Sequence, residues 1–299
     1  MSKSAILSSS IAKKYWMALT GLFLCLFLVG HLAGNLQLIL ITGEEGKRAF
    51  NEYAFFMTSN PAVKLLSYLT YASILFHSID GFVLAMQNKK ARPQNYAHNR
   101  PGKSSSTPSR YMAILGTVVL VFICTHMVNF WGKMHFEELP LHTTKLYPPM
   151  TNSPEGSDFY LTTSGSFLPA DQIEVKNGNQ LFIQDITEQM LEANPELVME
   201  GTNPKFAEGY KDLHGLVMTF FGKPKEGFPE NENALIYTWL YVLCMAVLGF
   251  HLWHGFSSAF QSLGLRTESY KKAIIAAGKG FAVVVATLFA IIPLVIYYL

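Results

Sequence analysis

The sequence predicts an all-α membrane protein, in which a five-transmembrane-helix bundle carries an extended acidic extracytoplasmic connection between its third and fourth helices. Composition is the first reason: half of the 299 residues are hydrophobic and only 15% are charged, whereas about a quarter are charged in average soluble domains. The second reason is five long apolar runs. The third is that 16 of the 21 acidic residues fall between positions 133 and 232, which explains a mean hydropathy of only +0.22.

Each of the five runs is long enough to cross a bilayer, for which about 20 residues suffice. The first run exceeds the core of a signal peptide, and no small-residue cleavage site follows it, so we expect an uncleaved transmembrane helix. The spans are expected at 15–41, 62–86, 111–131, 235–260 and 273–299. We therefore expect one transmembrane domain over residues 1–299, with an extracytoplasmic insertion at 133–232.

Basic residues set the orientation, because lysine and arginine are enriched on cytoplasmic flanks. With five spans, the N-terminal segment and the second and fourth connections lie on one side, and they hold 12 basic residues against one acidic residue, Glu268. These basic residues are Lys3, Lys13, Lys14, Lys89, Lys90, Arg92, Arg100, Lys103, Arg110, Arg266, Lys271 and Lys272. The first and third connections are net acidic. We expect a cytoplasmic N-terminus and an extracytoplasmic C-terminus.

The insertion shows no catalytic or metal-binding motif. It contains a short strand-like segment at 180–184 and a helical pattern at 211–221. Its three histidines, His135, His142 and His214, are scattered, so a surface role is expected for each. The chain also has no glycine-rich nucleotide loop, no nucleophile elbow and no basic aromatic stripe for nucleic acid. Its three cysteines lie in separate apolar runs and are expected to be packing residues.

Histidines inside the apolar runs are the main functional signal, because an ionisable group in hydrocarbon is costly to keep. Four runs carry one about 14 to 17 residues after the start of the helix, which is roughly 21 to 25 Å along the axis. They are His31, His77, His126 and His251. Since successive helices alternate in direction, His31 and His126 should share an outer level, and His77 and His251 an inner level.

Two histidines on facing helices can hold a haem iron between two imidazoles, so the simplest occupant is one low-spin b haem per level. Taken singly, such a histidine could equally be a hydrogen-bonded packing residue. Zinc is less suitable because its sites gather about four ligands at one place, and a di-iron site needs several glutamates. Gly30 and Gly34 flank His31 at a spacing that admits either a close helix or a flat macrocycle.

Two further ionisable groups lie near the inner ends of the spans. Lys279 can extend its ammonium group to the cytoplasmic interface. Asp80 follows His77 by three residues and lies on the same helical face. Its carboxylate could hydrogen-bond a haem propionate, join a quinone proton route or pair with His254. Asp80 and His254 are therefore candidate quinone-site residues.

The fourth run holds two histidines, and spacing selects one of them as the partner of His77. Ten residues separate His77 from Gln87, the polar end of its helix, and ten separate His251 from Gln261. A haem between His77 and His254 would need a tilt or an axial shift of roughly 4.5 Å. We therefore expect His251 to be the ligand.

Several of these runs contain motifs typical of a known family. The most specific are MALTGLFLCLFLVGHLAGNL, AFNEYAFFMTSNP, HMVNFW and FHLWHGFSSAFQSLG. On these segments, and over all five spans, the chain resembles the dihaem cytochrome b subunit of succinate:quinone oxidoreductase (succinate dehydrogenase or fumarate reductase, complex II) in its single-polypeptide form. The resemblance implies that His31 and His126 ligate an outer haem and that His77 and His251 ligate an inner haem.

The resemblance also implies a role. Such a subunit lies in the bacterial cytoplasmic membrane, contacts membrane lipid, and anchors a flavoprotein and an iron–sulfur protein to the cytoplasmic face. It passes electrons between the iron–sulfur clusters and a membrane quinone, commonly menaquinone, while the partners perform the dicarboxylate chemistry. A higher-order oligomer of the complex is compatible with this role. Some relatives carry a glutamate two residues before the fourth-helix ligand, where this chain has Gly249.

Two other interpretations remain open at the level of sequence. A polytopic transporter or proton channel would use the intramembrane histidines and Asp80 as a relay. Inverted repeats and broken helices would favour a transporter, but the sequence shows no repeat and has proline inside one span only, at Pro293. The other interpretation is a purely structural anchor without haem.

Overall fold

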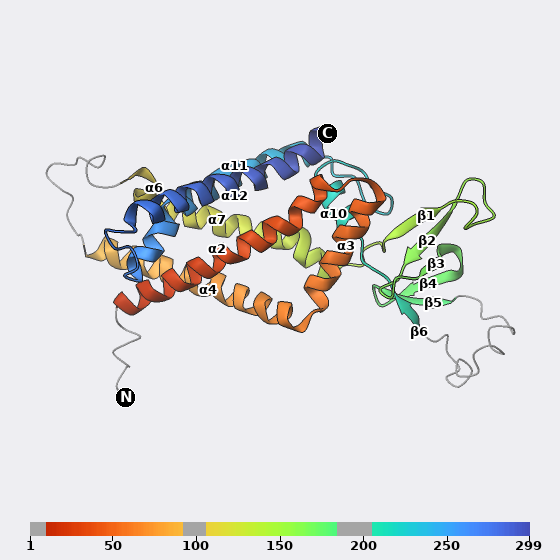
Figure 1. Cartoon of the computed structure of the whole chain (residues 1–299), viewed down its shortest axis with the longest axis horizontal. Helices are drawn as coiled ribbons and strands as arrows, with labels where there is room; N and C mark the ends of the chain where they lie inside the picture. Colours follow the sequence, from red (N-terminus) through yellow and green to blue (C-terminus); the bar gives the residue numbers. More distant parts are fainter. Residues whose placement is uncertain (1–9, 92–105, 184–204) are drawn as a thin grey trace, which may run out of the picture. The chain divides into compact units, whose positions relative to one another are not determined.

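The computed structural model describes residues 10–91, 106–183 and 205–299. Among these residues, five helical stretches are long and apolar enough to cross a membrane, and they run side by side in Figure 1. Their helices are α2 (Ser10–Leu40), α4 (Pro61–Lys90), α7 (Met112–His126), α11 (Ala234–Ser262) and α12 (Lys271–Tyr298). The prediction of five apolar spans is confirmed, and the chain has the character of a multi-pass membrane protein.

The chain divides into two compact units. The membrane unit comprises Met1–Ile39, Asn60–Met127 and Glu232–Leu299, and the connector unit comprises Leu40–Ser59 and Val128–Asn231. The connector unit thus combines the insertion with the first connection. Since consecutive spans alternate in direction, the first and third connections leave the spans on the same side, which allows them to fold together.

The outward surface of the membrane unit is apolar. Large side chains from four different helices are more than half exposed, among them Leu26, Leu65, Phe76, Val121 and Leu243. Such a surface is unfavourable in water, whereas lipid tails are as apolar as leucine side chains. The exposed apolar residues therefore agree with a lipid environment for these helices.

Local sequence signals fix where individual helices begin and end. Asn60 caps α4, because its side-chain oxygen accepts hydrogen bonds from the backbone N–H groups of Ala62 and Val63 at 2.9 and 3.3 Å, and Pro61 occupies the first helical turn.

Helix α7 ends at His126 and continues as the π-helix η1 (Met127–Gly132) and the short helix α8 (Lys133–Phe136). A short helix, α6 (Thr107–Arg110), precedes α7.

Helices α11 and α12 pack closely through two glycines. A Cβ atom at Gly249 would lie 3.0 Å from the Cβ of Ala286, and one at Gly278 would lie 2.8 Å from Cδ1 of Phe256. Small residues allow apolar helices to approach in this way. A larger side chain at position 249 would press on Ala286 and require a small shift between the two helices.

The connector unit includes the end of the third apolar span, formed by most of η1 and by α8, together with two further helices and six described strands (Figure 1). The two further helices are α3 (Gly43–Ser59) and α10 (Leu213–Phe220). One antiparallel sheet has the order β1-β2-β3, from Thr143–Leu146, Ser157–Leu161 and Phe167–Pro169. The other has the order β4-β5-β6, from Ile173–Lys176, Gln180–Ile183 and Lys205–Glu208, and the 3₁₀ turn η2 (Ala170–Gln172) joins the two.

The predicted strand at 180–184 and helix at 211–221 are confirmed as β5 and α10. The extent of β structure was not predicted, so only the membrane unit is all-α. Leu141, Ile173 and Leu181 form the buried core beside the second sheet. Asn177 and Gly178 make the β4–β5 turn with φ angles of 51° and 83°, which asparagine and glycine adopt most readily.

Some sequence-based expectations concern residues that the structure does not describe. Lys3, Arg92, Arg100 and Lys103, which contribute to the predicted orientation, lie outside the described residues, as does Gln184 at the end of the predicted strand. The remaining basic residues of the N-terminal segment and of the second and fourth connections lie within the described part.

We predict that Gly278→Ala destabilises the membrane unit, because the added methyl group meets Phe256. Overpacking of this kind costs about 1–3 kcal/mol. Gly280→Ala is the matched control, since Gly280 lies on the same helix and a Cβ atom there has no neighbour within 4 Å. Unfolding of the purified chain by SDS titration measures both variants, and equal stability of the two would contradict the α11–α12 packing.

Candidate functional site

The structure brings His31 of α2 and His126 of α7 together. Their ring centroids are 5.8 Å apart and the ring planes are nearly perpendicular, at 85°. Each ring stacks on the phenylalanine four residues earlier in its own helix: Phe27 lies 5.3 Å from His31, and Phe122 lies 5.6 Å from His126. Phe289 of α12 also contacts His31, at 5.7 Å. We call His31 and His126 the outer pair.

His77 of α4 and His251 of α11 form a second pair, called the inner pair. Their ring centroids are 6.3 Å apart at an interplanar angle of 69°. Each ring also lies beside one glycine of a different helix: Gly21 of α2 beside His77, and Gly116 of α7 beside His251. A Cβ atom at Gly21 of α2 would lie 3.1 Å from Cε1 of His77, and one at Gly116 of α7 would lie 3.3 Å from Cε1 of His251. Any larger residue at either glycine would push against the ring.

The two pairs lie at two levels of the bundle. Gly21, which adjoins the inner pair, precedes His31 of the outer pair by ten residues on the same helix. Ten residues correspond to about 15 Å along the axis of an α-helix. The structure therefore places the four histidines in the two pairs that alternating helix direction predicts.

The spacing of each pair suits two imidazoles that share one metal ion. An imidazole nitrogen binds a metal ion at about 2.0–2.1 Å, so two ring centroids on opposite sides of the ion are separated by roughly 6 Å. The observed separations are 5.8 and 6.3 Å. Among the described residues, no group of three or more His, Cys, Asp or Glu side chains is arranged to hold a metal ion. Each pair offers two imidazole nitrogens, and two imidazoles on facing helices can hold a haem iron.

Hydrogen bonds fix the tautomer of His77. Its Nδ1 lies 3.2 Å from the carbonyl oxygen of Met17 and 3.3 Å from Oγ1 of Thr20. A carbonyl oxygen only accepts hydrogen bonds, so Nδ1 must carry the hydrogen. The lone pair of the ring is then on Nε2, which is the arrangement of a metal-binding histidine whose other nitrogen is held by an outer partner.

The rings of His31 and His251 have different hydrogen-bond surroundings from that of His77. Asn35 donates through Nδ2 to the backbone oxygen of His31 at 2.7 Å, and the same Nδ2 lies 3.4 Å from Nδ1 of His31. Nδ1 of His251 is buried and has no hydrogen-bond partner among the described residues. The two imidazoles of the inner pair therefore have unequal surroundings.

The remaining candidate residues lie near the inner pair along their helices but are not joined to one another. His254 and Asp80 both have partly exposed side chains, and no ion pair or hydrogen bond links them within the described part of the chain. Pairing of Asp80 with His254, one of three roles considered for that carboxylate, is therefore not observed. Lys279 places its Nζ 5.2 Å from the centre of the Trp253 ring in a cation–π contact.

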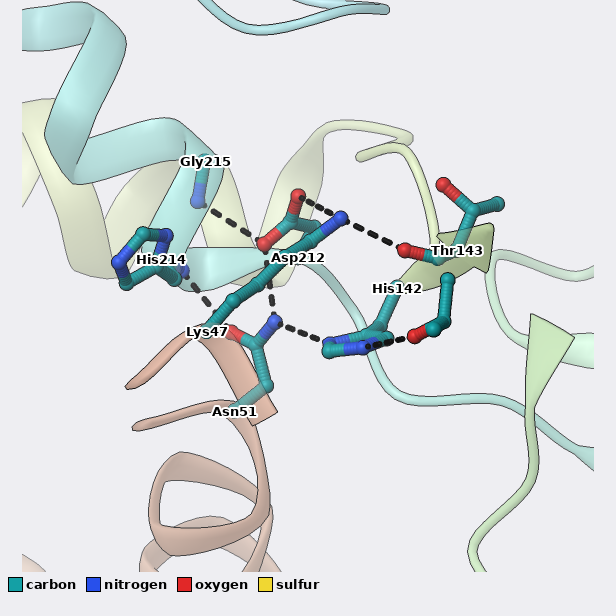
Figure 2. A network of polar contacts seen from close by, with 8 residues as sticks. Lys47, Asn51, His142, Thr143, Asp212, His214 and Gly215 are labelled. Atoms are coloured by element: carbon teal, nitrogen blue, oxygen red, sulfur yellow. Dashed lines mark hydrogen bonds and ion pairs between the residues drawn. The ribbon is translucent and has the colours of Figure 1, made fainter. Parts of the chain in front are cut away.

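A second histidine cluster lies in the connector unit and was not predicted (Figure 2). His142 and His214 were expected at the surface, but they are 0% and 6% exposed, so this expectation was wrong. His135, in contrast, is exposed as expected. Isolated histidines carry no sequence signal for burial, because their partners come from distant segments: Asn51 lies 91 residues before His142.

Asn51 of α3 is the centre of this cluster. Its Nδ2 donates to Nδ1 of His142 at 3.0 Å and to Oδ1 of Asp212 at 2.8 Å, and its Oδ1 accepts from the backbone N–H of His214 at 2.9 Å (Figure 2). Because both amide hydrogens are used, Nδ1 of His142 must be an acceptor. Its Nε2 then donates to Oγ1 of Thr144 at 3.0 Å. Protonation of His142 would place two N–H groups against each other.

Asp212 links this cluster to helix α10 and to a lysine. Its Oδ1 accepts from the backbone N–H of Gly215 at 2.9 Å and so caps α10. Its Oδ2 lies 3.7 Å from Nζ of Lys47, which also donates to the carbonyl oxygen of Thr143 at 2.8 Å. The cluster therefore holds α3, α10 and the start of β1 together.

Burial lowers the pKa of both histidines to about 4 from an ordinary value of 6.5. For His142, desolvation is the main cause, and the charge of Lys47 lowers the pKa further while Asp212 opposes it. For His214, desolvation again dominates, opposed by Asp212 and aided by Lys225. Both rings are therefore neutral at neutral pH, consistent with their hydrogen-bond geometry.

The fold and the paired histidines define a class: a multi-pass membrane protein whose bundle holds two imidazole pairs at two levels, with each ring partly buried. No family model, curated protein or solved structure matches the chain. The class therefore rests on the helices and on the geometry of the four intramembrane histidines.

We predict that the connector unit loses stability between about pH 6.5 and pH 4. The pKa of each buried histidine is lower in the folded chain, so the unfolded chain binds more protons in this range and folding weakens as the pH falls. A shift to about 4 corresponds to roughly 3 kcal/mol per histidine. Hydrogen–deuterium exchange of the full chain, corrected for intrinsic rates, should show faster exchange in α10 at low pH.

His142→Asn is the control for this pH effect. The side-chain oxygen of the new asparagine can accept a hydrogen bond from Asn51, but the amide does not titrate. The exchange protection of α10 in this variant should therefore depend less on pH. Unchanged protection of α10 from pH 7 to pH 4 in the wild-type chain would contradict the assigned hydrogen-bond pattern.

Proposed function

We propose that this chain is the membrane-anchoring dihaem cytochrome b subunit of a succinate:quinone oxidoreductase, either succinate dehydrogenase or fumarate reductase. The observation that carries the proposal is the geometry of the two histidine pairs, with ring centroids 5.8 and 6.3 Å apart. The sequence resemblance pairs the same residues. Two independent lines, helix geometry and motif, thus support one ligand assignment.

Each pair would hold one b-type haem: His31 and His126 the outer, and His77 and His251 the inner. Bound haem supplies reversible one-electron chemistry. The chain positions the imidazoles on four different helices, and phenylalanine rings stack on His31 and His126. Nε2 of His77 is free to bind iron because Nδ1 is held by Met17 and Thr20. Electrons would pass through the bundle between the two levels.

Partners would supply the rest of the reaction. In the proposed role, a flavoprotein and an iron–sulfur protein bind the cytoplasmic face, where the basic connections offer a docking surface and a flank for anionic lipid. Quinone, commonly menaquinone in two-haem members of the family, exchanges electrons within the membrane, with Asp80 and His254 as candidate site residues. The membrane is the bacterial cytoplasmic membrane, with the N-terminus in the cytoplasm and the C-terminus outside it. A proton path through a glutamate at position 249 is not available, because this residue is glycine.

We predict that the purified chain contains two b-type haems and that His251→Ala removes the inner haem. His254→Ala is the matched control, since the two histidines are one turn apart on α11 and the ring observed beside His77 is that of His251, at 6.3 Å between ring centroids. The control should keep both haems and at most shift a potential or slow quinone turnover. Pyridine-haemochrome assays and reduced-minus-oxidised spectra measure both outcomes.

Two results would contradict this ligand assignment in different ways. Loss of the inner haem in His254→Ala, with retention in His251→Ala, would show that the ligand on α11 was chosen wrongly. A wild-type chain without haem would reject the proposed function and favour a transporter or an anchor without haem.

We also predict that the chain co-purifies with a flavoprotein and an iron–sulfur protein in mild detergent. This chain has no flavin or iron–sulfur motif, so partner subunits must supply the dicarboxylate chemistry. Affinity purification from native membranes, with flavin and iron analysis, measures the association. Isolation of the chain alone, with full quinone activity coupled to succinate, would argue against this assembly.

A further inference from the structure

Helices α2 and α7 share a pattern of three residues that links the two histidine pairs. Each carries a histidine of the outer pair with a phenylalanine four residues earlier, Phe27 on α2 and Phe122 on α7. Each also carries a glycine ten residues before that histidine, and this glycine adjoins a histidine of the inner pair. Gly21 and Gly116 therefore occupy equivalent positions. Both helices thus carry one histidine of the outer pair and one glycine whose backbone adjoins a histidine of the inner pair.

The residue before the glycine breaks this equivalence. On α2 it is Thr20, whose side chain is buried, and on α7 it is Leu115. The hydroxyl of Thr20 donates to the carbonyl oxygen of Trp16 at 2.8 Å, which leaves its lone pairs to accept from His77. Leucine has no polar group to offer, and Nδ1 of His251 is buried without a hydrogen-bond partner among the described residues.

We infer that Thr20 is a positioning residue that, with the carbonyl group of Met17, holds His77 in the Nδ1–H tautomer and makes the two imidazoles of the inner pair unequal ligands. The inference rests on the proposed haem-binding function. The Nδ1–H group is shared between two acceptors at 3.2 and 3.3 Å, and Gly21 adjoins the same edge of the ring. These contacts leave the opposite nitrogen, Nε2, for the metal.

A hydrogen bond from Nδ1–H raises the basicity of a metal-binding imidazole. A more basic ligand favours ferric over ferrous iron, so loss of the bond should favour reduction. Removal of an outer partner typically costs 10- to 100-fold in metal affinity or activity, so such partners measurably tune a metal site. Because the Met17 carbonyl remains, we expect a partial effect: a rise in the ratio of reduced to oxidised inner haem at a given potential.

The test is a redox titration of the haem-loaded chain, followed by visible spectra. Thr20→Val removes the hydroxyl at constant shape and should raise the midpoint potential of the inner haem, while the outer haem stays unchanged. Thr20→Ser should restore the wild-type potential. Thr70→Val is the matched control, because Thr70 is also buried and, within the described part of the chain, its hydroxyl donates to the carbonyl oxygen of Leu66, four residues earlier on α4.

A measurement on the chain without haem separates this inference from the proposed function. The haem-free chain is labelled with ¹⁵N-histidine, and the ring-nitrogen NMR signals of His77 are assigned by comparison with the His77→Ala variant. These signals should show the Nδ1–H tautomer. The Nε2–H tautomer would overturn the inference. The inference would also be overturned if wild type and Thr20→Val both bound two haems and the midpoint potential of the inner haem were the same in both chains. The proposed function would stand in that case. A wild-type chain that binds no haem would reject the proposed function, and the tautomer would still decide the role of Thr20.

Discussion

The constraint on which this structure depends is the cost of burying imidazole nitrogens in an apolar bundle. A buried polar group without a partner costs free energy, and the spans offer few polar side chains. Two rings are therefore placed opposite each other at each level, where a shared metal ion would use one nitrogen of each. The other nitrogen of each ring needs a separate hydrogen-bond partner. For His77 the partners are the carbonyl oxygen of Met17 and the hydroxyl of Thr20, both on α2.

Helices α2 and α7 show how one length of helix can serve both levels. A ten-residue interval separates a glycine that adjoins an inner ring from a histidine that belongs to the outer pair. The glycine is needed because a side chain there would displace the ring, and a stacked phenylalanine supports the outer histidine. Displacement of either helix along its axis would disturb both pairs at once, which ties the two levels together mechanically.

The connector unit meets the same constraint with polar side chains. Asn51 satisfies His142, Asp212 and a backbone N–H group through one amide, and Asp212 also caps α10. Such a network is favourable only while every member keeps its protonation state. Its lowered histidine pKa values therefore couple the stability of this unit to pH, whereas apolar packing between α11 and α12 is insensitive to pH.

The five spans, the four histidines within them and the pairing of these histidines could be predicted from residue order, because hydrophobic run length, axial rise and alternating direction are local or additive properties. The two sheets of the connector unit and the burial of His142 and His214 could not. Nor could the contact between Thr20 and His77, which are 57 residues apart. These features emerge in the folded chain, since burial and hydrogen bonding depend on which distant segments meet, and no periodicity within one segment encodes its partner.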